Sequence, residues 1–334
     1  MASALALALG LGGCGSDGSN GGGGTAGTGA TGFGGLGGSG ATGGSGGSGG
    51  SAGSAGSAGS GGSAGSGGAA DGGSDASAGT PADHVLISEV GIQPGGAEFI
   101  ELYNPTSAAI DLSNYYVADN SAYYKLTSGP WNPTETPGTD FLARFPAGTT
   151  IAAGAVLVIA GDPSPGANNQ TFEQIFGKCA NFALNSEGAA RSCGGGSVPA
   201  MLIPTNGSVG DSKGALLSND REMVVLFEWD GSASTVKDVD YVTWGTTFDN
   251  NTRADKTGIA GYAADTPRSS QKSVVITIVP EGGTALSISR CKLEPGEKLS
   301  GGNGMSGHDE TSEDLADAFQ AGSPSPGTKN TCLP

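Results

Sequence analysis

The chain has 334 residues, of which 64 are glycine, and its formal net charge at pH 7 is −17. A negative field of this size repels phosphate, so we expect no nucleic-acid partner. The sequence holds only two histidines, His84 and His308, which argues against chemistry built on histidine clusters. No apolar run reaches the roughly 18 residues that a transmembrane helix needs.

The first 13 residues predict an export signal. Ala2–Leu11 is a short Ala/Leu run, and small residues follow it. The sequence Leu11-Gly12-Gly13-Cys14 resembles the lipobox of bacterial lipoproteins. The resemblance implies cleavage before Cys14 and acylation of its thiol, and therefore a lipoprotein anchored in a membrane of the bacterial cell envelope, at the outer membrane or cell surface. One feature departs from the pattern, because no Lys or Arg precedes the apolar run.

A linker follows at residues 14–83. From Gly15 to Asp83 there are 31 glycines and 13 serines in 69 residues. Such a segment has almost nothing apolar to offset the entropy cost of ordering, so it predicts a disordered tether. A Gly/Ser coil of this length has a mean end-to-end distance of roughly 45 Å.

The remaining residues indicate an all-β fold. Short runs rich in β-branched and aromatic residues alternate with Gly, Pro and Asn, a pattern typical of a sandwich or barrel. The one short helix that we expect is Ser312–Ala321, with Ser312 or Thr311 as its N-cap. The predicted strands are His84–Gly91, Glu98–Tyr103, Ile110–Val117, Thr149–Ile159, Arg221–Trp229, Val236–Trp244, Val274–Val279 and Ala285–Ser289.

Several of these segments resemble the lamin tail domain, an immunoglobulin-like module. The resemblance rests on Val85-Leu-Ile-Ser-Glu-Val90, Glu98-Phe-Ile-Glu-Leu-Tyr-Asn-Pro105, Ile110-Asp-Leu-Ser-Asn-Tyr-Tyr-Val117, Ile151–Ile159, Val239-Asp-Tyr-Val242 and Ser323–Asn330. It implies an immunoglobulin-like β-sandwich over residues 84–330, with a long insertion at about residues 172–213. Asn114-Tyr115 departs from the family's usual Gly-Trp.

Four cysteines lie outside the anchor: Cys179, Cys193, Cys291 and Cys332. An even number in an exported chain predicts two disulfides. Three pairings are open, and we favour Cys179–Cys193, closing the insertion, and Cys291–Cys332, tying the tail to the last strand. Each would stabilise the fold by about 3 kcal/mol. Without a C-x-x-C motif or an adjacent histidine, we expect no metal site at these cysteines.

Five carboxylates are candidates for a Ca²⁺ site or an acid/base pair. Glu89, Glu98 and Glu101 fall on two strands that we expect to pair, but Glu98 and Glu101 would face opposite sides of their strand. Asp238 and Asp240 would share a face, without an apparent third ligand. For all five we prefer a structural role, with the side chains solvated or bonded to the backbone.

His308-Asp309-Glu310 suggests part of a catalytic triad, but no nucleophile motif accompanies it, and we expect a solvent-exposed loop. The aromatic residues are mostly expected in the core. One ring of each neighbouring tyrosine pair is a candidate for surface contact, because neighbours on a strand point to opposite faces. The aromatic residues considered are Tyr115, Tyr116, Tyr123, Tyr124, Trp131, Trp229 and Trp244.

These features favour a non-enzymatic, lipid-anchored surface protein that displays its folded domain for binding or adhesion. We expect no catalytic residues, no cofactor and no metal. The expected partners are the membrane, through the lipid at Cys14, and a surface protein or glycan. Two alternatives remain open: a module associated with a secreted hydrolase or nuclease, and a structural spacer of the envelope.

Overall fold

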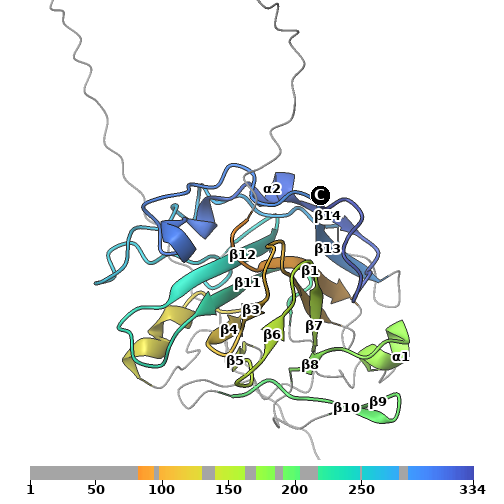
Figure 1. The fold of residues 1–334 in the computed structure, drawn as a ribbon. Coiled ribbons are helices and arrows are strands. Elements are labelled where there is room, and N and C mark those ends of the chain that lie inside the picture. Colours follow the sequence, from red (N-terminus) through yellow and green to blue (C-terminus); the bar gives the residue numbers. More distant parts are fainter. Residues whose placement is uncertain are drawn as a thin grey trace, which may run out of the picture. The chain divides into compact units, whose positions relative to one another are not determined.

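The computed structural model describes residues 82–93, 98–129, 140–161, 171–184, 191–203, 217–248, 250–277 and 285–334. Within them, strands dominate and helices are few and short (Figure 1). The predicted signal, Cys14 and nearly all of the predicted tether lie outside the described residues. None of the described helices is long and apolar enough to cross a membrane.

The larger of two main sheets has six strands in the order β14-β13-β1-β2-β7-β8. Neighbouring strands are antiparallel, except that β7 and β8 are parallel. The strands are β1 (Leu86–Gln93), β2 (Phe99–Tyr103), β7 (Val156–Ala160), β8 (Phe182–Ala183), β13 (Leu286–Arg290) and β14 (Phe319–Gly322). The sheet therefore joins the first described strand to segments near the end of the chain.

The second sheet has four antiparallel strands in the order β12-β11-β4-β5, and two small ribbons pair β3 with β6 and β9 with β10. The four strands are β4 (Tyr115–Ala118), β5 (Leu142–Arg144), β11 (Arg221–Glu228) and β12 (Lys237–Gly245). The ribbon strands are β3 (Ile110–Asp111), β6 (Thr150–Ile151), β9 (Arg191–Cys193) and β10 (Gly196–Val198). The short helices are η1 (Tyr123–Ser128), α1 (Phe172–Phe176), η2 (Met305–Gly307), η3 (Glu310–Ser312) and α2 (Leu315–Ala318).

The hydrophobic core lies between the two sheets. Apolar side chains of β1 and β2, among them Ile87 and Leu102, belong to one continuous cluster with side chains of β11 and β12 such as Val224 and Tyr241. Burial of this apolar surface is the main force that holds the layers together. The all-β, immunoglobulin-like sandwich predicted from the sequence is thereby confirmed.

The insertion packs a second, smaller apolar cluster against the outer face of the large sheet. Phe99 of β2 contacts Phe172 of α1, with ring centroids 5.8 Å apart. Helix α1 begins with a capping box in which Thr171 and Gln174 bond each other's backbone N–H groups. Strands β1 and β2 are buried on both faces, because the insertion covers Phe99 and the C-terminal tail covers Glu89 and Glu101.

Two predicted elements near the end of the chain are wrong. The helix expected at Ser312–Ala321 is reduced to α2, capped by Asp314, because Phe319 to Gly322 instead pair with β13 as strand β14. Of the strand expected at Val274–Val279, the described part forms only an isolated bridge from Val274 to Trp244. Tertiary pairing overrides the local preference in both places.

Candidate functional site

The four cysteines form two disulfides, Cys179–Cys193 and Cys291–Cys332, which are the pairs favoured from the sequence. The first closes the insertion at Cys193, the last residue of β9. The second attaches the C-terminal tail to the end of β13. Cys14 lies outside the described residues, and its acylation stays a prediction.

The acidic residues of β1 and β2 are buried and bonded to protein groups. Glu89 and Glu101 face each other across the strand pair. The backbone N–H of Ser325 donates to Glu89 at 2.8 Å, and that of Gly327 donates to Glu101 at 2.6 Å. Glu98 reaches a different segment, where it accepts from the backbone of Leu217. The preference for a structural, backbone-bonded role is supported, but these side chains are not solvated.

Asp238 and Asp240 on β12 meet two buried cations that the sequence analysis did not connect with them. The Lys256 ammonium lies 2.7 Å from Asp238, and the Arg290 guanidinium approaches both oxygens of Asp240 at 2.8 and 2.9 Å. Burial raises the pKa of both carboxyls, and the neighbouring cations oppose that rise. Each carboxylate therefore forms a buried ion pair in which the neighbouring cation balances its charge.

The expected surface ring is absent from the pair Tyr115 and Tyr116, and in the pair Tyr123 and Tyr124 only Tyr124 is partly exposed. Tyr115 and Tyr116 are both buried, and so is Tyr123, while Tyr124 packs half-buried against the core. Trp244 is also buried. Trp229 is partly buried against the core, and Trp131 lies outside the described residues.

The segment His308-Asp309-Glu310 is not the solvent-exposed loop expected from the sequence. Asp309 and Glu310 are buried, and the His308 side chain is only 13% exposed. The loop is tight because the N–H of Gly302 bonds the carbonyl of Gly307, and that of Gly304 bonds the carbonyl of His308. A Cβ at Gly302 or Gly304 would collide with the His308 backbone, so glycine is required there.

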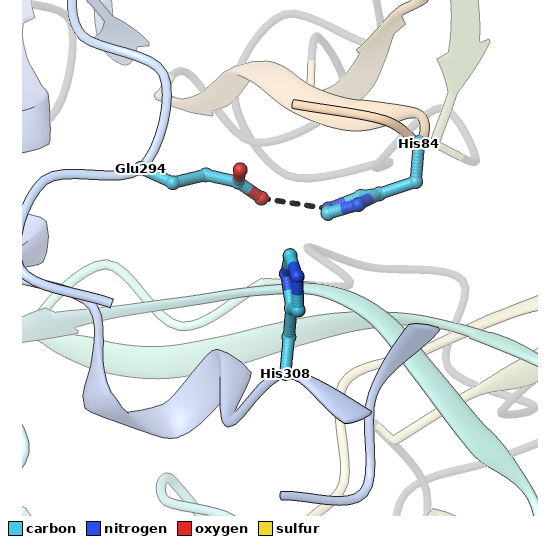
Figure 2. Close-up of side chains that lie close together, drawn as sticks. All are labelled: His84, Glu294 and His308. Atoms are coloured by element: carbon cyan, nitrogen blue, oxygen red, sulfur yellow. Dashed lines mark ion pairs between the residues drawn. The ribbon is translucent and has the colours of Figure 1, made fainter. Parts of the chain in front are cut away.

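This loop brings the only two histidines of the sequence together. The rings of His84 and His308 lie edge to face, with centroids 5.8 Å apart. His84 comes just before β1, and its side chain is 1% exposed. Its Nε2 lies 2.7 Å from Oε1 of Glu294, without the orientation of a hydrogen bond. Figure 2 shows Glu294 and His84 pointing at each other and the His308 ring pointing toward the space beside them.

The other nitrogen of His84 has a partner of its own. Nδ1 lies 3.0 Å from the carboxylate of Asp83, which also accepts from the hydroxyl of Ser306 at 3.1 Å. Burial lowers the pKa of His84, but Glu294 and Asp83 outweigh that effect and raise it to about 9. The hydrogen bond to His84 lowers the pKa of Asp83 in turn.

Two further glutamates complete the cluster. An oxygen of Glu297 lies 3.4 Å from Nδ1 of His308, and the Glu297 side chain is fully buried. Burial and the nearby Glu294 raise the pKa of Glu297 to about 8, and burial together with Glu297 raises the pKa of Glu310 well above its ordinary value. Imidazole and carboxylate groups in this arrangement can hold either a proton or a metal ion.

The sequence analysis missed this cluster. Its members come from three segments, residues 83–84, 294–297 and 308–310, and no spacing motif connects positions more than 200 residues apart. The one available signal was that both histidines stand beside or near acidic residues. The pairing of β1 with β13 brings residues 83–84 near residues 294–297, and the bridge between Lys298 and Asp309 brings residues 308–310 beside them.

Comparison with known proteins assigns the first part of the described fold to a family. The family model described as "Lamin Tail Domain" matches residues 78–246, half of the chain. The match ends before β13 and before the Ser323–Asn330 segment that also resembled this family. Among curated proteins, no sequence matches the chain significantly. A crystal structure of a DUF4876 family protein from Bacteroides thetaiotaomicron is similar over 74% of each chain, with 15% identity and a TM-score of 0.34.

Proposed function

The chain belongs to the lamin tail domain family, and from this premise we propose that it is a non-enzymatic, lipid-anchored protein of the bacterial cell envelope. In this proposal the family domain is displayed for binding or adhesion. A disordered Gly/Ser-rich tether would connect it to the lipid at Cys14. The location we propose is the outer membrane or cell surface.

The order of features along the sequence carries the proposal. Leu11-Gly12-Gly13-Cys14 comes first, the Gly/Ser-rich tract follows, and the folded domain comes last. Attached acyl chains contribute about 0.8 kcal/mol for each buried CH₂, so two or more give a lasting membrane attachment. A tether of roughly 45 Å then places a domain clear of the lipid headgroups.

Two properties of the folded domain support this assignment. Its two disulfides are typical of proteins that fold in an oxidising compartment outside the cytosol. The formal net charge of residues 84–334, −13, opposes attraction to nucleic acid, which leaves a surface protein or a glycan as the partner class we propose.

The anchoring is tested by replacing the acylated residue. The native chain and the Cys14→Ser variant are expressed in bacteria fed a labelled fatty acid, with Ser16→Ala as a matched control two residues away. We expect label and membrane association in the native chain and the control, and neither in Cys14→Ser. Membrane association of Cys14→Ser with no label in the native chain would disprove lipid anchoring.

Display and binding need separate measurements. Elastase added to intact cells should cut the Ala-rich tether and release the domain if it is displayed outside the cell. Full-length protein in detergent is then screened against glycan arrays and envelope proteins. A saturable partner would support binding or adhesion, whereas release without any partner would favour the structural spacer.

A further inference from the structure

We propose that His84, Glu294 and His308, completed by Glu297 or Glu310, form a binding site for one divalent transition-metal ion of the Zn²⁺ type. The site would join the start of the domain to two loops near its end. This inference does not depend on lipid anchoring or on the partner of the domain.

The distances between the candidate ligand atoms fit one ion. His84, Glu294 and His308 each offer an atom within 4.8 Å of the other two, and so do Glu297, His308 and Glu310. His308 belongs to both groups. Tetrahedral Zn²⁺ with N and O ligands at 2.0–2.2 Å places neighbouring ligand atoms roughly 3.3 Å apart. The 2.7 and 3.4 Å separations measured here lie on either side of that value.

The second observation is that the atoms aimed into the cluster lack hydrogen-bond partners. Nε2 of His84, Oε1 of Glu294, both carboxylate oxygens of Glu297, Nδ1 of His308 and Oε1 of Glu310 are buried and make no hydrogen bond. Buried polar atoms in proteins almost always have partners, and unsatisfied ones demand an explanation such as an ion. Each of the five residues in the two groups therefore offers at least one buried atom without a hydrogen-bond partner.

The third observation concerns Asp83. Histidines that bind metals commonly donate their other ring N–H to a carboxylate, which fixes the tautomer and the ring orientation. Nδ1 of His84 makes this contact with Asp83 at 3.0 Å, and Ser306 holds the same carboxylate. Nε2 is thereby directed into the cluster as a ligand atom.

The ligand set selects the class of metal. Imidazole nitrogen and carboxylate oxygen together suit Zn²⁺ and its first-row neighbours, whereas Ca²⁺ and Mg²⁺ prefer oxygen alone. The side chains of His84, Glu294 and Glu297 are 1%, 5% and 0% exposed. Such an enclosed site is typical of structural rather than catalytic zinc, since a catalytic ion keeps a position open to substrate.

The site lies at a meaningful place in the chain. Residue 84 is the first after the predicted tether, and residues 294–310 lie beyond the family match at residues 78–246. An ion there would fasten the entry of the domain to the segment that follows β13. Its binding energy would add to the stability of the folded state, because the unfolded chain does not hold these groups together.

The test uses full-length protein in detergent, stripped with a chelator and then titrated with Zn²⁺. We expect about one ion per chain by mass spectrometry of bound metal, and a melting temperature that rises with Zn²⁺ concentration but not with Ca²⁺ at the same concentration. Co²⁺ should give the visible absorption of a tetrahedral complex and be displaced by Zn²⁺. If Zn²⁺ neither binds at about one ion per chain nor shifts melting, the cluster is an ion pair between His84 and Glu294 and the proposal is wrong.

Variants locate the ion. His308→Gln and Glu294→Gln keep side-chain size and should abolish the Co²⁺ spectrum and the Zn²⁺-dependent melting shift. Asp83→Asn should weaken Zn²⁺ affinity by about 10- to 100-fold, the usual effect of losing a partner of a metal-binding histidine. The control is Asp317→Asn, which removes an exposed carboxylate paired with Lys292. Native Zn²⁺ affinity in folded His308→Gln and Glu294→Gln, verified by circular dichroism, would overturn the assignment.

Discussion

Glu89 and Glu101 stand directly opposite each other on β1 and β2, and both side chains are buried in the same sheet. Each accepts hydrogen bonds from the C-terminal tail, Glu89 from Ser325 and Glu101 from Gly327. Burial is the main cause that raises the pKa of Glu101 to about 7, and the charge of Glu89 adds to it. A pair of acids at this position makes the stability of the fold depend on pH.

The first prediction is that stability falls as pH rises from about 4.5 to about 7. Over this interval the folded state keeps a proton on Glu101 that the unfolded chain has lost. The free energy of unfolding therefore falls as pH increases. Glu101→Gln removes this titration. In the native protein the Ser88 hydroxyl and the Gly327 N–H both donate to the Glu101 carboxylate, and the amide oxygen of glutamine can still accept one of these bonds. A pKa shift changes the free energy of unfolding by ~1.4 kcal/mol per unit. Relative to the native protein, the free energy of unfolding of the variant should therefore rise by roughly 2–3 kcal/mol from pH 5 to pH 8.

Urea unfolding of both proteins at pH 5 and pH 8 measures this difference. Buried carboxyls that do not interact with Glu101 titrate equally in both proteins, so they cancel from the comparison. Asp317→Asn serves as the exposed control and should follow the native pH profile. Identical pH profiles for Glu101→Gln and the native protein would show that folding does not raise the pKa of Glu101.

The second prediction concerns the buried cation Lys256. Its ammonium lies 2.7 Å from Asp238, 3.0 Å from Asp265 and 2.7 Å from the hydroxyl of Tyr123. Lys256→Met leaves two carboxylates buried without a counter-charge, and removing one partner from a buried pair typically costs about 3–5 kcal/mol.

The matched control is Lys292→Met. Lys292 pairs with Asp317 at 2.6 Å, but both side chains are 52% exposed, and an exposed pair contributes only about 0–1 kcal/mol. Chemical denaturation of the two variants should therefore separate them clearly. Equal losses of unfolding free energy would mean that water reaches Lys256.

The third prediction is that the two disulfides contribute differently to the free energy of unfolding. Cys291 and Cys332 are 41 residues apart, while Cys179 and Cys193 are 14 apart, and the longer loop restricts the unfolded chain more. Replacing Cys291 and Cys332 together by alanine should lower the free energy of unfolding by about 2–4 kcal/mol. The same change at Cys179 and Cys193 should lower it by less.

Loss of Cys291–Cys332 should also release the tail that covers Glu89 and Glu101. In that variant we expect the pKa of Glu101 to fall from about 7 toward its ordinary value, because water then reaches the carboxyl. Nuclear magnetic resonance titration of labelled glutamate carboxyls measures the shift. An unchanged pKa for Glu101 would show that the tail stays in place without the disulfide.

The fourth prediction is that the folded domain stays in one piece after its chain is cleaved in the insertion. A protease site introduced at Lys213, outside the described residues, divides the chain between β10 and β11. The fragments should elute together in gel filtration, because β11 pairs with β4 and β13 pairs with β1 across the cut. A variant with its protease site in the tether should instead release the tether from the domain. Separation of two folded fragments after the cut at Lys213 would contradict a single sandwich.

Local sequence alone determined the class of fold and its main strands. The runs around Val85–Val90, Glu98–Tyr103, Arg221–Trp229 and Val236–Trp244 combine β-branched residues with turn residues at their ends, and all four contain strands. The disulfide pairs were also predictable, since each preferred pair closes a recognisable segment. These features depend on neighbours in the chain, which a sequence shows directly.

Tertiary structure alone determined the conformation of the C-terminal part and the assembly of the candidate metal site. Phe319–Gly322 becomes a strand only because the edge of β13 is available to pair with it. His84 and His308 become neighbours only because β13 lies beside β1 and the glycines of residues 302–307 fold the last loop back. Contacts between residues so distant in the sequence depend on the packing of whole sheets, and no local pattern encodes them.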